Sequence, residues 1–230
     1  MKRFLIASHL DGCKAMAKLQ ALARERQPDG VFFAGGILGK HTVSHAEKLK
    51  AWKDCFDALG ELGVFTAAIP GAADVPLREF LQLATDSEVS TPTLHVAHAS
   101  LFEEDGVAVG GLGGELTEAD DHCEDRLCYA RPSAMYFLRA LWRAEQPYKV
   151  LLLSVPPPGR LGGEAGNPIC GDFIDSYHPS LCVVAGATER RGFQRVAHTL
   201  VVNPGRLADG SAAWLDRSRS KDEQVEFLEL

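Results

Sequence analysis

The chain has 230 residues, and its 24 Lys and Arg against 31 Asp and Glu give a formal net charge of -7. This negative charge argues against broad electrostatic attraction to nucleic acid or to an anionic membrane, and no apolar stretch approaches the length of a membrane span. The first apolar run is interrupted by His9 and Asp11 before a signal-peptide core is complete, so we expect a soluble, cytoplasmic protein.

Short apolar runs rich in β-forming residues alternate with amphipathic segments along most of the chain. The runs predict strands over residues 3–8, 30–35, 63–70, 93–99, 106–113, 149–155, 181–186 and 198–204. Apolar residues at helical spacing predict helices over residues 13–27, 44–62, 76–84 and 131–146. This alternation requires crossover connections and therefore indicates parallel strand pairing.

The last third of the chain follows a different pattern, in which residues 193–203, 211–218 and 224–230 succeed one another with only turns between them. Such spacing is typical of an antiparallel meander. No Pro/Ser/Gly-rich linker or low-complexity tract divides the chain. We therefore expect one α/β domain over residues 1–230, with two packed sheets flanked by helices.

In open α/β sheets, ligands bind beyond the carboxyl ends of the strands, so the segments after the strands are where chemistry is expected. Here these segments read ASHLDG (7–12), AGGILG (34–39), IPGAADVP (69–76), SVPPPG (154–159) and AGATERRG (185–192). In order and neighbourhood they resemble the motifs of the calcineurin-like metallophosphoesterase superfamily, over about Arg3 to Asp216. That resemblance implies a four-layer α-β-β-α sandwich with two mixed sheets. It also implies a site where two metal ions activate a hydroxide against a phosphate ester.

Most positions that carry a metal-binding side chain in that family do not carry one here. His9 and Asp11 match the first motif with its two ligands exchanged, Asp74 is the retained acidic residue of the third, and the turn at residues 203–210 has Arg206 where serine is common. The replacements are Gly36 for the bridging aspartate, Ala72 for the ligand asparagine, Ala73 for the catalytic histidine, Val155 for a ligand histidine, and Ala187 and Glu189 for the last two histidines. The resemblance is strong for the scaffold and largely absent for the catalytic residues.

Three donors remain at the matched positions, and they are too few for a two-metal centre with a bridging carboxylate. If they converge, His9, Asp11 and Glu189 form a set that suits one zinc, manganese or iron(II) ion. The alternative is that His9 and Asp11 hydrogen-bond each other or nearby backbone and hold a loop in place. We therefore expect no cofactor, with one divalent ion as the alternative.

Four arginines fall in or beside these segments, and guanidinium groups bind phosphate bidentately without a metal. They are Arg160, Arg190, Arg191 and Arg206. They predict a site for a phosphate-containing ligand, and the alternative is that they are solvated or salt-bridged surface residues.

Other motifs favour structural interpretations. The acidic segment over residues 113–125 lacks the spacing of a calcium loop and is interpreted as a solvated loop that could overhang the crevice. His41 and His45 share a helical face without a third ligand, while His95 and His98 lie three apart on a predicted strand and so point to opposite faces. The six cysteines contain no CxxC pair, so we expect them reduced and several of them buried.

Together these features predict a non-catalytic member of the metallophosphoesterase fold, a pseudoenzyme that binds a phosphate-containing ligand or a protein partner through the former active-site crevice. The first alternative is a hydrolase of phosphoric esters with an altered, mononuclear metal site. A further alternative is a structural subunit of a homo-oligomer whose interface lies elsewhere. Fold alone does not decide among them.

Overall fold

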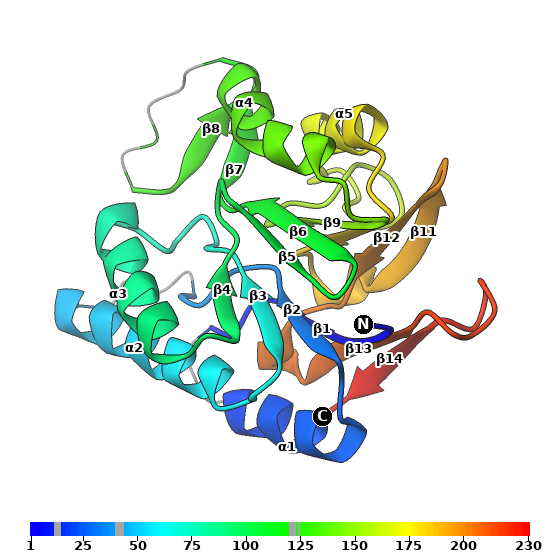
Figure 1. The fold of residues 1–230 in the computed structure, drawn as a ribbon. Helices are drawn as coiled ribbons and strands as arrows, with labels where there is room; N and C mark the ends of the chain where they lie inside the picture. The colour runs from blue at the N-terminus through cyan, green and yellow to red at the C-terminus, as the bar shows by residue number, and fades with distance from the viewer. Residues whose placement is uncertain (12–14, 40–43, 120–122, 124) are drawn as a thin grey trace.

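The computed structural model describes residues 1–230 except 12–14, 40–43, 120–122 and 124. Two six-stranded sheets and one two-stranded sheet make up the β-structure of this part of the chain (Figure 1). Sheet A has the order β14-β13-β1-β2-β3-β4, sheet B has the order β11-β12-β10-β9-β6-β5, and the small sheet C pairs β7 with β8. The strands are β1 (Arg3–Ala7), β2 (Gly30–Phe33), β3 (Phe65–Ala68), β4 (Leu94–Val96), β5 (Leu101–Glu104), β6 (Val107–Leu112), β7 (Glu115–Thr117), β8 (Cys128–Ala130), β9 (Tyr148–Leu153), β10 (Leu181–Val184), β11 (Gly192–Val196), β12 (Thr199–Asn203), β13 (Ser211–Asp216) and β14 (Val225–Glu229).

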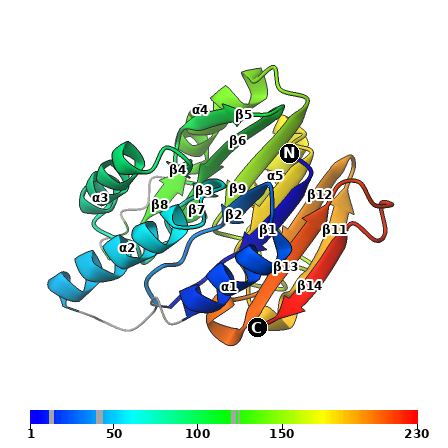
Figure 2. The same ribbon diagram turned by 60° about the horizontal axis from the view of Figure 1, so that its bottom comes forward.

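Helices cover the outer face of each sheet, which produces four layers (Figures 1 and 2). The helices are α1 (Met16–Arg26), α2 (His45–Gly60), α3 (Leu77–Ser90), α4 (Arg131–Arg143) and α5 (Pro168–Tyr177), with the short 3₁₀ helices η2 (Thr188–Arg190) and η3 (Leu207–Asp209). Three apolar clusters fill the spaces between layers: one packs α1 to α3 on sheet A, one lies between the sheets, and one packs α4 and α5 on sheet B. This is the predicted four-layer α-β-β-α sandwich.

The predicted strands and helices all occur, and the structure differs from the prediction in two respects. First, the short helix α5 and the strands β5, β7 and β8 were not predicted. Second, the C-terminal strands do not form one meander, because β11 pairs with β12 in sheet B while β13 pairs with β14 in sheet A. A pattern of antiparallel strands shows which strands are half-buried, but it does not show which of two stacked sheets receives them.

The parallel strands β1 to β4 of sheet A and β6, β9, β10 and β12 of sheet B bring their carboxyl ends to one edge of the sandwich. Backbone hydrogen bonds join the loops of sheet A there to the turn after β12 of sheet B and to the segment before β8 of sheet C. Leu207 N donates to Ser8 O at 2.7 Å, and Leu127 N donates to Ala72 O at 2.8 Å. We call this edge the carboxyl edge. It is formed by residues 7–11, 34–39, 69–74, 113–116, 154–166 and 185–191, together with the turn 203–210.

The expectation that all cysteines are reduced is wrong for one pair, because Cys123 and Cys128 form a disulfide. Their separation of five residues matches no recognised motif, and only the structure shows that their Cα atoms lie 6.2 Å apart. Cys55, Cys170 and Cys182 are buried, as expected for several of the cysteines. Cys13 lies outside the described residues. Within the described part of the chain, no helix combines the length and the apolar character needed to cross a membrane.

Candidate functional site

Backbone hydrogen bonds join the first two loops of the carboxyl edge, which follow β1 and β2. His9 N donates to Gly35 O and Leu10 N donates to Gly36 O, each at 2.8 Å. Gly36 has a φ of +82°, and a Cβ atom placed on it would lie 3.0 Å from Cδ2 of His9. The His9 ring therefore fills the space next to position 36, where the resemblance places a bridging aspartate.

Backbone contact continues into the third loop, which follows β3. A Cβ atom on Gly71 would lie 2.5 Å from the backbone N of Gly36, so the two loops approach each other more closely than any larger residue permits. The three loops after β1, β2 and β3 consequently form one packed layer.

Asp74, the retained acidic residue of the third motif, is fully buried and holds that layer together. Its two oxygens accept hydrogen bonds from Gly71 N at 2.7 Å, Ile37 N at 3.1 Å, Leu38 N at 3.0 Å and Trp52 Nε1 at 3.0 Å. Burial raises the pKa of Asp74, while the four N–H donors favour its charged form. Because every donor belongs to the protein, Asp74 joins α2 and two loops and presents no oxygen to a ligand.

His9 and Asp11 both have left-handed backbone, with φ values of +53° and +48°. Nδ1 of His9 lies 3.3 Å from Ser8 Oγ, and Asp11 forms an ion pair with Arg206 from the turn after β12. The Asp11 and Arg206 side chains are 27% and 36% exposed. A guanidinium group therefore neutralises the carboxylate that would otherwise be available to a metal ion.

The turn that carries Arg206 is held by the fully buried Asn203. Its Nδ2 lies within hydrogen-bonding distance of Arg190 O, Ala187 O and Leu161 O, at 3.1, 3.3 and 3.4 Å. Its Oδ1 accepts from Gly205 N at 2.9 Å. One amide side chain thus fixes the loops after β9 and β10 against the turn.

Glu189, the third predicted metal ligand, is exposed on η2. Among the residues that the structure describes, no group of three or more His, Cys, Asp or Glu side chains is arranged to hold a metal ion. His9, Asp11 and Glu189 are all described, so the structure does not bring them together as one ligand set. Four further motif positions supply no donor side chain, namely Gly36, Ala72, Val155 and Ala187. The residues present therefore do not fit the two-metal centre of the fold family.

Two of the predicted phosphate-binding arginines lie on neighbouring loops. Arg190 is exposed, and a Cβ atom on Gly163 would lie 3.0 Å from its Cζ, so its guanidinium rests on the loop that follows β9. Arg160 is also exposed, and its Nε would lie 3.9 Å from a Cβ atom on Gly192. The loops after β9 and β10 thus each carry one exposed arginine that lies against the other loop.

The other two arginines are engaged by carboxylates. Arg191 Nη2 forms an ion pair with Glu229 Oε1 of β14 at 2.7 Å. Arg206 is paired with Asp11. Ligand binding by the four arginines stays a prediction.

Sequence reasoning missed a buried pair beside the carboxyl edge, formed by His98 after β4 and Tyr129 of β8. His98 is 8% exposed, Gly113 N donates to its Nδ1 at 3.1 Å, and its Nε2 therefore carries the proton that it donates to Tyr129 Oη at 2.9 Å. Desolvation lowers the pKa of His98 to about 4 and raises the pKa of Tyr129 to about 12. The pair is neutral at pH 7. Only the proximity of the strand ends brings these residues together, and the sequence carries no signal for it.

The remaining motif residues have structural partners or lie outside the described part. His45 Nε2 lies 3.4 Å from Glu79 Oε2. His41 is outside the described residues. In the acidic segment Glu115 pairs with Arg126 at 3.0 Å, whereas Asp120, Asp121, His122 and Glu124 are not described. His95 stacks on Phe102 with ring centroids 4.5 Å apart.

Comparison with known proteins agrees with this fold. A family model described as metallophosphoesterase, calcineurin superfamily, matches residues 1–227. The crystal structure of TT1561 of Thermus thermophilus is 26% identical, with a TM-score of 0.87 over 99% of this chain and 98% of that chain. A dimetal phosphatase from Danio rerio is 8% identical, with a TM-score of 0.68 over 99% of this chain and 98% of that one, and at this identity the likeness shows the fold alone. A search of curated proteins returns no match.

Replacing Asp74 by asparagine is expected to destabilise the protein by about 2–4 kcal/mol, because one acceptor oxygen is lost and an NH₂ group is placed against buried N–H donors. Urea unfolding followed by circular dichroism measures this loss. Asp86→Asn on the exposed face of α3 is the matched control and should change stability by less than about 0.5 kcal/mol. Equal stabilities of the two variants would show that Asp74 does not hold the loops together.

The lowered pKa of His98 predicts that the free energy of unfolding decreases in acid. Its pKa of about 4 in the native state lies below the ordinary value of 6.5, so between these pH values the unfolded chain binds more protons than the folded one. Its contribution is therefore fully present above about pH 6.5 and is lost as the pH falls toward 4, by up to about 3 kcal/mol. Urea unfolding at pH 7 and pH 5 should show a smaller decrease for His98→Asn, which keeps an acceptor but does not titrate, than for the wild type. A decrease of the same size in both would contradict the assignment.

Proposed function

This chain belongs to the calcineurin superfamily of metallophosphoesterases, and from that membership we propose that it binds a phosphate-containing ligand at the carboxyl edge without hydrolysing it. One observation carries the proposal. The Arg206 guanidinium is paired with Asp11, so the carboxylate of the first-motif loop is engaged by a side-chain cation instead of being free to bind a metal ion.

Loss of the bridging carboxylate supports the same conclusion. Position 36 is glycine, and the His9 ring lies against it. A hydroxide nucleophile activated by two metal ions needs an oxygen ligand between them. This edge of the sheet therefore lacks the donors for the family reaction, and no hydrolytic step is assigned to it.

The phosphate-binding groups in this proposal are Arg190 and Arg160. Both are exposed, and they lie on the loops after β10 and β9. A phosphate dianion accepts charge-assisted hydrogen bonds from guanidinium groups, each contributing about 1.5–3 kcal/mol. Because the whole chain is negative, with a formal charge of -7, such a site relies on these local cations.

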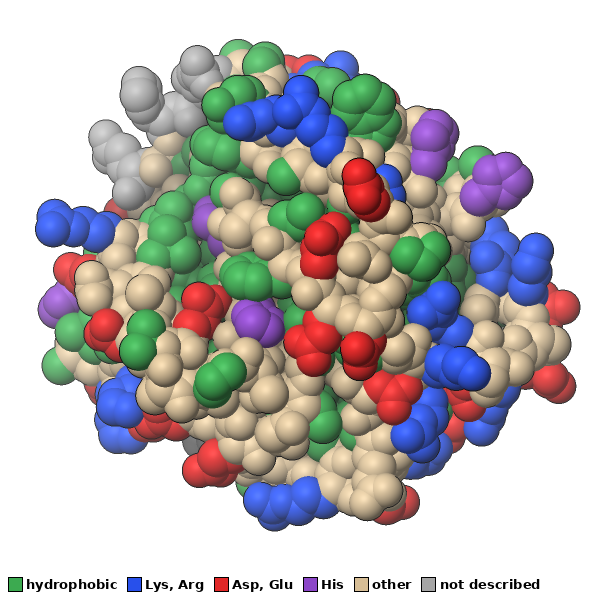
Figure 3. All heavy atoms as spheres, viewed as in Figure 1, with side chains coloured by type: hydrophobic (Ala, Val, Ile, Leu, Met, Phe, Trp, Pro, Cys, Tyr) green, Lys and Arg blue, Asp and Glu red, His purple; other side chains and the backbone are tan. Residues whose placement is uncertain are grey.

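A second candidate function, a subunit of a homo-oligomer, is favoured by the surface of α4. Tyr136 and Trp142 are each 60% exposed, and Arg139 Cζ lies 3.4 Å from the Tyr136 ring centroid. Figure 3 shows hydrophobic and basic side chains together at the upper edge of the molecule over α4. A groove of about 610 Å³ between α4 and β5 is lined by Arg139, Arg143, Glu103 and Glu145 among other residues. Aromatic and arginine side chains are the types enriched in interfaces, and the balanced charges suit a second copy of the same surface.

The binding proposal predicts that inorganic phosphate binds the wild type in isothermal titration calorimetry and that Arg190→Ala weakens binding about tenfold or more, because one charge-assisted interaction is removed. Arg160→Ala should act in the same direction. Arg191→Ala is the matched control, since this neighbouring arginine is paired with Glu229, and it should leave the affinity within about twofold. Absence of phosphate binding, or equal effects of Arg190→Ala and Arg191→Ala, would refute the proposal.

The same proposal predicts no turnover of p-nitrophenyl phosphate or bis(p-nitrophenyl) phosphate with Mg²⁺, Mn²⁺ or Zn²⁺ added. Turnover that is lost in Asp11→Ala, together with stoichiometric metal in protein purified without chelator, would establish the mononuclear hydrolase instead.

The oligomer candidate predicts a native mass above that of one chain, measured by light scattering on a gel-filtration column. Trp142→Lys combined with Tyr136→Lys should reduce the mass to that of the monomer, because charge replaces the apolar contact. Val89→Lys, at an exposed apolar residue of α3, should not. A monomeric wild type excludes this candidate.

A further inference from the structure

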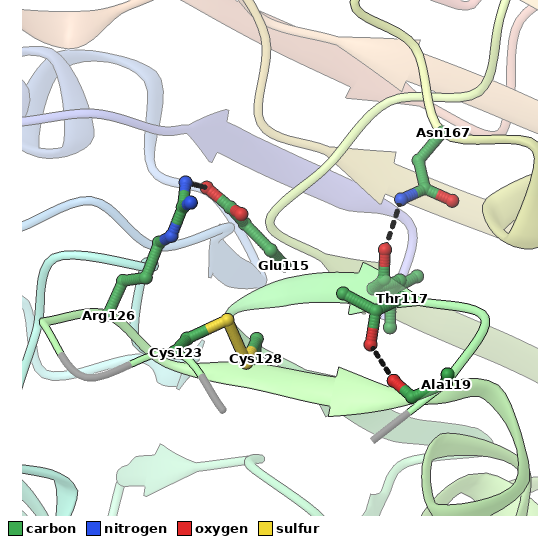
Figure 4. Close-up of a disulfide and its surroundings, with 8 residues drawn as sticks. Glu115, Thr117, Ala119, Cys123, Arg126, Cys128 and Asn167 are labelled. Atoms are coloured by element: carbon green, nitrogen blue, oxygen red, sulfur yellow. Dashed lines mark hydrogen bonds and ion pairs between the residues drawn. A yellow bond between two sulfur atoms is a disulfide. The ribbon is translucent and has the colours of Figure 1, made fainter. Parts of the chain in front are cut away.

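The Cys123–Cys128 disulfide lies beside the carboxyl edge and joins the connection between β7 and β8 to the first residue of β8 (Figure 4). Its Cα atoms are 6.2 Å apart, and both cysteines are half-buried. The other described cysteines, Cys55, Cys170 and Cys182, are fully buried. Burial also raises the pKa of the Cys182 thiol, which lowers its reactivity further. Within the described part of the chain, Cys123 and Cys128 are therefore the cysteines that are not fully buried.

The residues on either side of Cys128 contact two neighbouring segments. Leu127 N donates to Ala72 O of the third-motif loop at 2.8 Å, and Glu115 N donates to Leu127 O at 2.9 Å. Tyr129, the residue after Cys128, is hydrogen-bonded to His98. Residues directly before and after Cys128 thus touch the loop after β3 and the end of β4.

Besides the disulfide, β8 is held by a short strand ladder and by packing on α4, where the Tyr129 and Phe137 ring centroids lie 5.6 Å apart. Sheet C consists of two strands with three paired residues, from Glu115 with Cys128 to Thr117 with Ala130. Two-stranded sheets are marginal on their own and need packing or a covalent link. The Glu115–Arg126 pair seen in Figure 4 has side chains 39% and 58% exposed, so it contributes little. The disulfide joins Cys128, the first residue of β8, to Cys123 earlier in the β7–β8 connection, so it constrains how the chain enters β8.

We propose that Cys123 and Cys128 form a thiol–disulfide exchange site whose redox state sets how firmly β8 is held against Ala72 and His98. The reductant is a small dithiol. Its thiolate attacks one sulfur of the Cys123–Cys128 bond, which forms a mixed disulfide and releases the other cysteine as a thiolate that takes up a proton. The second thiol of the reagent then closes its own disulfide and releases the remaining cysteine, so two electrons and two protons pass to the protein.

The direction of the effect follows from the covalent constraint. In the oxidised protein, the crosslink limits the conformations open to the segment from Cys123 to Cys128 and favours the paired form of β8. In the reduced protein that constraint is lost, so the Leu127–Ala72 and Tyr129–His98 contacts open more often. This inference is independent of the proposed phosphate site.

Thiol titration of the native protein with an aromatic disulfide reagent tests the first half of the inference. After treatment with dithiothreitol and desalting without denaturant, two more thiols should react than before treatment. The Cys123→Ser, Cys128→Ser double variant should gain none. If the wild type gains no thiols, either the pair is not oxidised or the reductant does not reach it, and the inference is wrong in both cases.

Hydrogen exchange followed by mass spectrometry tests the second half. On reduction, peptides that contain Glu115 and Leu127 should exchange about tenfold or more faster, whereas peptides from β10 should not change. The double serine variant should show the fast pattern with or without dithiothreitol, which separates loss of the crosslink from other effects of the reagent. Equal exchange of oxidised and reduced wild-type protein at Leu127 would overturn the proposal.

Discussion

The buried carboxylate of Asp74 is the constraint on which the rest of the carboxyl edge depends. Its four hydrogen bonds join the indole of α2 to the backbones of the second and third loops, and those loops in turn set the position of the first. A buried carboxylate is tolerated only when its hydrogen bonds are complete, and completing them here requires the loops to pack backbone against backbone. The glycines at positions 36 and 71 permit that approach.

This packing explains how the site differs from a two-metal centre. Where the family resemblance places a bridging carboxylate, the His9 ring occupies the available space, and where it places a metal ion next to the first motif, Arg206 supplies the positive charge. The departures from the motif therefore compensate one another. A chain that had lost single ligands at random would leave buried carboxylates without partners, which is costly.

Much of the fold could be predicted from sequence because its parallel strands are short, rich in β-forming residues and buried on both faces, with amphipathic helices between them. The helix α5, with the sequence PICGDFIDSY, was missed because Pro, Gly and Cys dilute its helical pattern over only ten residues. The strands β7 and β8 have three residues each, too few for any periodicity. The motif resemblance located the loops of the site, but it could not place side chains. The Arg206–Asp11 pair, the His98–Tyr129 pair and the disulfide each depend on how strand ends meet in space.

The order of strands in sheet A also constrains how the molecule folds. The N-terminal strand β1 lies between β2 and β13, and β13 pairs with β14 near the C-terminus (Figure 1). Arg3 pairs with Asp216 across this junction, so one side of β1 stays open until the chain has been synthesised as far as β13. Contacts between residues so far apart in sequence slow folding, because a long loop must close first. An apolar strand with an unpaired edge is exposed to intermolecular pairing during that interval, and the arrival of β13 removes this exposure.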